Sequence, residues 1–198
     1  MSQTSTPGQL DRRAVVRGLL ADRGSLLLVT GLGSPSYDAF AAGDSERTFY
    51  LWGAMGGAAM MGMGLALARP REHVLVLTGD GEALMGLGAL ATIGVQKVAN
   101  LTIAVLDNAH YGETGMQTSH TGRGVDLAAI ATASGFSWSQ TIATMDALEP
   151  LRARLRSGTG PGFATIRIAA DEPPRALPPR DGVYLKTRLR GALGLPPT

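Results

Sequence analysis

Apolar residues along the chain fall into short continuous runs, separated by stretches in which they recur at helical spacing. The runs lie at 25–30, 48–52, 73–79, 101–108 and 162–170, with a weaker one near 137–142. Strands that are apolar on both faces are typical of a parallel sheet covered by helices on each side. The pattern therefore predicts an α/β fold with a three-layer, doubly wound, mostly parallel sheet.

The stretches between these runs predict the helices. Helical spacing, Gly or Pro stops and an Asp at one start indicate helices at 11–24, after a turn within 31–40, and at 54–70, 82–99, 126–136, 144–157 and 183–193. Residues 109–124 have no periodicity and are expected to form a loop. No internal repeat is visible, so we expect one domain over residues 1–198, with loose ends at 1–9 and 194–198.

Composition excludes several classes of protein. Lys and Arg number 18 against 16 Asp and Glu, a balance that argues against a nucleic-acid partner. The absence of cysteine excludes disulfides and thiolate metal sites, and the first ten residues lack an apolar leader, so a cytoplasmic location is expected. The longest apolar stretch, 53–68, is short for a membrane span and rich in Gly, so no membrane partner is expected.

Candidate chemistry lies at the ends of two predicted strands. Gly79-Asp80-Gly81 ends one strand and Asp107-Asn108 ends the next, with 26 residues between Gly81 and Asn108. One βαβ unit of that length would bring both ends to the same edge of the sheet, where such folds bind ligands. A carboxylate, an amide oxygen and a backbone carbonyl suit Mg²⁺, and glycines let the backbone approach a phosphate. Gly-Asp-Gly alone also suits a bare turn, but the spacing to Asn108 favours a Mg-diphosphate site.

This spacing resembles the thiamine diphosphate motif, in which Gly-Asp-Gly precedes Asn by about 26 residues. The segment "LTGDGEALMGLGALATIGVQKVANLTIAVLDNAHYGETGMQ" is similar to the diphosphate-binding (PP) domain of sulfopyruvate decarboxylase β subunits and phosphonopyruvate decarboxylases. The resemblance covers residues 25–170 and is strongest over 50–120. It implies thiamine diphosphate and Mg²⁺ as cofactors.

The resemblance also implies roles for particular residues. Metal ligands would be the side chains of Asp80 and Asn108 and the carbonyl of His110. Gly79, Gly81 and Glu82 would meet the diphosphate through their backbone, with Glu82 replacing the family's frequent Ser or Ala.

Three further segments match cofactor-binding parts of the family. In "LWGAMGG", the carbonyl of Gly53 would face the aminopyrimidine and Met55 would support the bent cofactor, so these two stand nearest the catalytic chemistry. In "GLGSPS", Gly33 and Ser34 match the loop beside the diphosphate, and Tyr111 and Gly112 follow the metal loop as in the family.

The family's activating glutamate belongs to a separate pyrimidine-binding domain, for which this chain has no room. The resemblance therefore implies a partner, a pyrimidine-binding α subunit in a heterotetramer or larger assembly, and a small 2-oxo acid as substrate for decarboxylation. Tyr37-Asp38 replaces the family's usual Lys-Glu, which leaves the acid open. A cofactor-binding or regulatory partner without turnover is the alternative; a plain nucleotide-binding domain ranks last, because the first loop carries only half of a G-x-G-x-x-G pattern.

Other polar residues near the metal loop remain open. His120 could act as a general acid or face water, Glu113 could meet the substrate or lie exposed, and Arg123 could bind an anionic substrate group. The methionines of 60–63 more often belong to a core or an interface than to a cofactor site.

Overall fold

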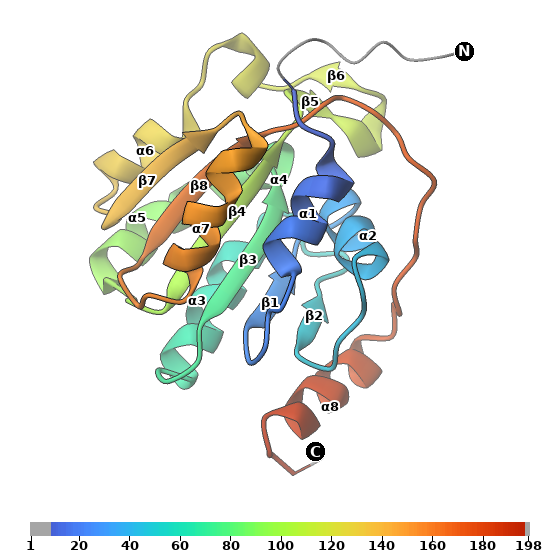
Figure 1. Cartoon of the computed structure of the whole chain (residues 1–198), viewed down its shortest axis with the longest axis vertical. Coiled ribbons are helices and arrows are strands. Elements are labelled where there is room, and N and C mark those ends of the chain that lie inside the picture. Colours follow the sequence, from blue (N-terminus) through green and yellow to red (C-terminus); the bar gives the residue numbers. More distant parts are fainter. Residues whose placement is uncertain (1–8, 197–198) are drawn as a thin grey trace.

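The computed structural model describes residues 9–196, and its centre is a six-stranded, all-parallel sheet (Figure 1). The spatial order is β2–β1–β3–β4–β8–β7. The strands are β1 (Leu27–Thr30), β2 (Thr48–Tyr50), β3 (Val74–Gly79), β4 (Leu101–Asp107), β7 (Trp138–Ile142) and β8 (Gly162–Arg167). This arrangement confirms the predicted fold class.

Helices cover both faces of the sheet (Figure 1). One face carries α1 (Arg12–Leu20), α2 (Ser34–Ala41) and α7 (Leu148–Leu155), and the other carries α3 (Ala58–Ala68), α5 (Gly88–Gln96) and α6 (Leu127–Ala133). Alternate residues of each strand enter the two cores, as the pleat requires: Leu75 and Leu77 face the first, Val74 and Val76 the second. Both cores form because the central strands carry apolar residues on both faces.

The chain reverses its direction of winding between β1 and β3. From β1 it moves outward to β2 by way of α2 on one face, then returns by way of α3 on the other face to form β3 beside β1. Ligands of doubly wound sheets bind at such a switch point, beyond the carboxyl ends of the strands. The two loops that leave these ends are 31–33, before α2, and the Gly79-Asp80-Gly81 segment.

Strands β3 and β4 are adjacent, as the spacing predicted. Their register pairs Gly79 with Leu106, so Asp80 and Asp107 emerge from neighbouring strand ends.

Four predicted segments differ from the structure. The helix expected at 54–70 begins only at Ala58, because the preceding loop turns through Gly53 and Gly56, whose φ angles are +71° and +90°. The helix expected at 82–99 is two helices, α4 (Asp80–Met85) and α5, which separate at Gly86. The break lets Gly86 approach the backbone of Gly56 closely.

The segment expected to be a loop, 109–124, contains short regular elements. A two-stranded hairpin joins β5 (His110–Tyr111) to β6 (Gln117–Thr118), and short 3₁₀ turns cover Gly112–Thr114 and Thr121–Arg123. A third such turn, Met145–Ala147, precedes α7, so the helix expected from 144 starts later.

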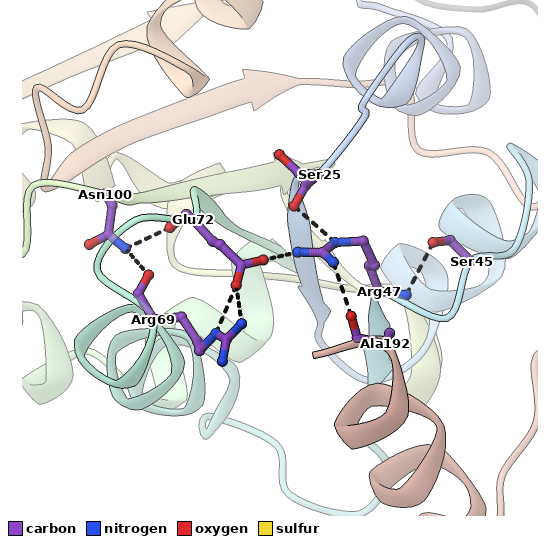
Figure 2. A network of polar contacts seen from close by, with 7 residues as sticks. All are labelled: Ser25, Ser45, Arg47, Arg69, Glu72, Asn100 and Ala192. Atoms are coloured by element: carbon purple, nitrogen blue, oxygen red, sulfur yellow. Dashed lines mark hydrogen bonds and ion pairs between the residues drawn. The ribbon is translucent and has the colours of Figure 1, made fainter. Parts of the chain in front are cut away.

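A polar network ties the chain together at the amino ends of the strands, away from the switch point (Figure 2). The Asn100 amide donates to the carbonyls of Ala66, Arg69 and Glu72, at 3.1, 3.1 and 2.7 Å. The Glu72 carboxylate also pairs with the guanidinium groups of Arg69 and Arg47. The end of α3 is thereby fixed to the start of β3.

The last helix, α8 (Gly182–Ala192), lies beside β2 at one edge of the sheet (Figure 1). Arg188 holds it there, since its guanidinium donates to the carbonyl of Thr48 at 3.0 Å and to Asp44 at 2.7 Å. Of the expected loose ends, 1–9 and 194–198, residues 1–8 and 197–198 lie outside the described residues, and Leu195 donates its N–H to the carbonyl of Arg190. Within the described part of the chain, no helix is long and apolar enough to cross a membrane.

Candidate cofactor site

A cavity of about 330 Å³ opens at the switch point, between the loops that follow β1, β3 and β4. Ten of the twelve predicted site residues line it: Ser34, Met55, Gly79, Asp80, Gly81, Glu82, Asn108, His110, Tyr111 and Gly112. Gly33 and Gly53 do not line it and lie in the adjoining loops. Residues from four separate segments thus meet at the place that the strand-end chemistry predicted.

Asp80 is a buried carboxylate with no cationic side chain paired to it among residues 9–196. Its Oδ2 accepts hydrogen bonds from the hydroxyls of Ser119 and Thr121, at 2.5 and 3.1 Å. Burial raises the pKa of Asp80, and the nearby charge of Asp107 raises it further, while the two hydroxyls act in the opposite sense. A bound cation would remove the cost of this isolated negative charge.

The hydroxyl hydrogens next to Asp80 are fewer than the close oxygen–oxygen contacts there. Thr121 Oγ1 lies 2.7 Å from Asp107 Oδ1 and 2.8 Å from Ser119 Oγ, besides its contact with Asp80. Four oxygen–oxygen contacts therefore share two hydroxyl protons. A proton on Asp80 would serve one more of these contacts, and a divalent cation beside Asp80 would offset the charges of Asp80 and Asp107, so the oxygens present fit such an ion.

Turns formed by two side chains shape the loop that follows β4. Asp107 Oδ1 accepts the N–H of Ala109 at 3.0 Å, and Asn108 Oδ1 accepts the N–H of His110 at 2.9 Å. Ala109 has φ +62°, in the left-handed region that non-glycine residues seldom occupy. The His110 ring, through Nδ1, lies 2.7 Å from the carbonyl of Asn108. This loop presents the Asn108 side chain and the His110 backbone to the cavity.

The Glu82 side chain joins three segments, a role that the sequence did not indicate; the expected backbone contact with the diphosphate stays a prediction. The Glu82 carboxylate accepts the Thr78 hydroxyl at 2.9 Å, the N–H of Leu32 at 3.1 Å and the N–H of Ala58 at 3.4 Å. Burial raises its pKa, while these three donors lower it. The side chain also needs a glycine at position 31, because a Cβ there would lie 1.6 Å from Glu82 Oε2.

The loop after β1 reaches the cavity at the start of α2. Gly33 has φ +79°, and Ser34 Oγ accepts a hydrogen bond from Nη1 of Arg12 at 2.9 Å. Arg12 is buried and its Nε lies 2.9 Å from Asp38 Oδ2; Arg13 Nε lies 3.1 Å from the other carboxylate oxygen. Burial raises the pKa of Asp38, and the two arginines oppose this. Asp38, one of the residues that departs from the family text, is therefore an anchor for Arg12.

Met55 lines the cavity close to Gly81. Its Cε lies 3.7 Å from the position that a Cβ on Gly81 would occupy, and that position is 2.9 Å from the Tyr111 ring. Gly81 therefore has no room for a side chain. Met55 itself is 38% exposed, and Gly53, two residues earlier, faces outward.

The structure separates the three residues whose roles the sequence left open. His120 and Arg123 are exposed and do not line the cavity, although His120 Nδ1 lies 3.1 Å from the Tyr111 hydroxyl. Glu113 lines the cavity and lies 3.6 Å from Arg175. These positions favour the water-facing reading for His120 and Arg123.

Sequence reasoning missed Arg12, Ser119 and Thr121. The only signal for Arg12 is the pair Arg12-Arg13 at the start of an otherwise apolar helix, and Ser119 and Thr121 lie in a segment without periodicity. Their contacts join residues 22 to 41 positions apart, which no local pattern records.

A doubly wound sheet with a buried aspartate and an asparagine at its switch point is typical of a diphosphate-binding domain. The chain belongs to the thiamine pyrophosphate enzyme family: residues 36–168 match its C-terminal TPP binding domain. Thiamine diphosphate is therefore the cofactor that the domain binds.

Particular relatives narrow the class further. The chain is 37% identical over 147 residues to the sulfopyruvate decarboxylase subunit beta of Methanocaldococcus jannaschii, covering 74% of this chain and 76% of that subunit. It is 43% identical over 122 residues to the same subunit of Methanothermobacter thermautotrophicus, with 62% and 63% coverage. It is 38% identical to the phosphonopyruvate decarboxylase of Streptomyces viridochromogenes, of which it spans 35%.

A solved structure has the same fold. The thiamine diphosphate-dependent 4-hydroxybenzoylformate decarboxylase of Rhodococcus jostii superposes with a TM-score of 0.69 over 87% of this chain and 35% of that enzyme. The sequence identity is 20%, so this likeness concerns the fold alone.

Proposed function

We propose that the chain is the β-type subunit of a split, thiamine diphosphate- and Mg²⁺-dependent 2-oxo acid decarboxylase. The observation that carries the proposal is the buried, cation-free carboxylate of Asp80, in one cavity with Asn108 and the carbonyl-bearing loop at His110. Relatives that bear the names of sulfopyruvate and phosphonopyruvate decarboxylases support the reaction class.

The chain's own residues hold the charged end of the cofactor. Asp80, Asn108 and the His110 carbonyl bind Mg²⁺ through hard oxygens. Gly79 and Gly81 leave space for the diphosphate beside the backbone, and a Cβ at Gly81 would already clash with Tyr111. A metal would bind the ionised form of Asp80, whose pKa is raised by burial, so cofactor affinity would depend on pH.

When bound, thiamine diphosphate supplies the electron sink for cleavage of the bond to carbon dioxide. Met55 supports the cofactor above Gly81. Leu106 and Ile168 line the same cavity and exclude water from the charged groups, which strengthens their interactions. The substrate is a small 2-oxo acid of the sulfopyruvate or phosphonopyruvate type.

A partner completes the site. Glu82, a carboxylate inside the cavity, is already engaged by Leu32, Thr78 and Ala58. We infer that a pyrimidine-binding α subunit supplies the activating glutamate, in a heterotetramer or larger assembly.

The surface next to the cavity supports such a partner. No charged residue occurs in 53–68 or in 83–96, and the exposed large apolar side chains of these segments are Met55, Met60, Leu67, Met85 and Val95. Apolar surface of this kind marks contact with another protein. The partner would cover α3 together with the mouth of the cavity.

Native mass spectrometry of the tagged chain, isolated from its own cells with Mg²⁺ and thiamine diphosphate, tests the proposal. We expect a second polypeptide and one cofactor per pair, and decarboxylation of a 2-oxo acid only by the complex. A homo-oligomer that binds no cofactor would contradict it and favour the role of a regulatory partner without turnover.

A further inference from the structure

Arg12 is a buried cation at the inner wall of the cofactor cavity. Its side chain is 5% exposed, and it is the only lysine or arginine that lines this cavity within residues 9–196. It comes from α1, outside the segment 36–168 that matches the family domain. A positive charge in this place has no part in the metal site.

The Arg12 guanidinium is fixed on one side and free on the other. Nε lies beside Asp38, and Nη1 donates to Ser34 Oγ at 2.9 Å and to the carbonyl of Asp171 at 3.3 Å. Nη2 makes no hydrogen bond with any residue of the described range 9–196. A guanidinium held in this way keeps a donor for a ligand at little cost in side-chain entropy.

The bond from Arg12 also orients the Ser34 hydroxyl. Because Ser34 Oγ accepts the Nη1 proton, its own proton is free to donate elsewhere. Ser34 is the first residue of α2, whose positive dipole end favours an anion, although Pro35 has no N–H and Ser36 and Tyr37 donate theirs to the Gly33 carbonyl. Arg12 and Ser34 thus present charge, a hydroxyl and a helix start at one place.

The position of this pair points to one end of the cavity. Arg12 and Ser34 line both the cofactor cavity and an adjoining cavity of about 240 Å³, whereas Met55 and Gly81 line only the former. The adjoining cavity adds the carboxylates of Asp171 and Glu172, so it does not favour an anion, whereas Glu113 lines both cavities and lies 3.6 Å from Arg175. The anion end lies where the two cavities meet.

We propose that Arg12, with the Ser34 hydroxyl, binds the outer phosphate of the cofactor's diphosphate. This inference rests on the proposed function and assigns a residue outside the metal motif. A charge-assisted hydrogen bond of this kind corresponds to about 10- to 100-fold in affinity.

The test compares thiamine diphosphate with thiamine monophosphate, and magnesium pyrophosphate serves as a probe that needs no pyrimidine partner. Calorimetric titration of the full chain, in complex where a subunit co-purifies, gives each dissociation constant with Mg²⁺ present. We expect Arg12→Gln to weaken thiamine diphosphate and pyrophosphate about 10- to 100-fold and thiamine monophosphate less than threefold.

Arg13→Gln is the matched control, because Arg13 is adjacent, shares Asp38 and lines neither cavity. We expect it to leave all three affinities within about twofold, because Arg13 lines neither cavity and Arg12 remains beside Asp38. Equal losses for the di- and monophosphate in Arg12→Gln, or no loss, would overturn the inference. If Arg12→Gln does not fold, Arg12→Lys is measured instead, and the ratio of its diphosphate loss to its monophosphate loss decides. A wild-type chain that binds none of the three ligands would refute the proposed function instead.

Discussion

Replacing Gly86 by alanine tests whether the break between α4 and α5 positions the cofactor. A Cβ at residue 86 would lie 2.3 Å from the carbonyl oxygen of Gly56 and 3.2 Å from its Cα. That loop carries Gly53 and Met55, which we propose face the cofactor. The substitution therefore acts on the site through the backbone and leaves every proposed ligand intact.

The size of the effect follows from this contact. An ordinary contact begins at about 3.4 Å, so the loop at Gly56 must move by roughly 1 Å. Overpacking of this kind costs about 1–3 kcal/mol of folding stability. A displacement of about 1 Å at a catalytic group lowers activity by about 100-fold. We expect Gly86→Ala to remain folded but to lose much of its cofactor affinity and activity.

Gly88→Ala is the matched control, since nothing lies within 4 Å of its Cβ position and alanine favours the start of α5. Thermal unfolding and titration with Mg²⁺ and thiamine diphosphate are measured on both variants. We expect Gly88→Ala to match the wild type. Equal cofactor affinity in the two variants would refute the argument that Gly86 sets the position of the Met55 loop.

Three further outcomes are expected. Asp80 holds a proton more tightly in the folded than in the unfolded chain, so its contribution to stability is full below its ordinary pKa of 3.8 and is lost as pH rises through the raised pKa. The melting temperature of the metal-free chain should therefore fall over that pH range. Asp80→Asn should flatten this fall and abolish Mg²⁺-dependent binding. Gly62→Ala should cost about 1–3 kcal/mol in urea unfolding, because its Cβ would lie 2.1 Å from Val76, whereas Gly64→Ala, with open space, should not. Arg188→Ala should cost about 1–3 kcal/mol and expose α8 to limited proteolysis; equal digestion of variant and wild type would contradict this.

The strand-end chemistry was predictable because strand order follows from local patterns. Apolar runs fix the strands, and the spacing of Asp80 and Asn108 fixes adjacent strand ends, as the register of Gly79 with Leu106 confirms. Whether these residues bind metal stays a prediction. The break at Gly86 was not predictable, since a continuous apolar pattern runs through it and only the approach of Gly56 reveals its cause.

The parts of the site that the sequence did not predict depend on contacts between segments distant in the chain. Glu82 matches a position where the backbone meets the diphosphate, and nothing in its neighbourhood indicates that its carboxylate joins Leu32 to Ala58. Arg12 likewise lies before the recognisable domain and meets Ser34 only after the sheet has formed.

The position of α8 has a consequence for association through the sheet. An unpaired strand edge can add a strand from another molecule, and two such edges allow growth without limit. Here α8 lies beside β2, and Arg188 occupies the carbonyl of Thr48, while no strand pairs with the outer side of β7 within residues 9–196. With one edge obstructed, pairing through the other joins two copies and then stops, so misassembly by this route ends at a dimer instead of a fibre.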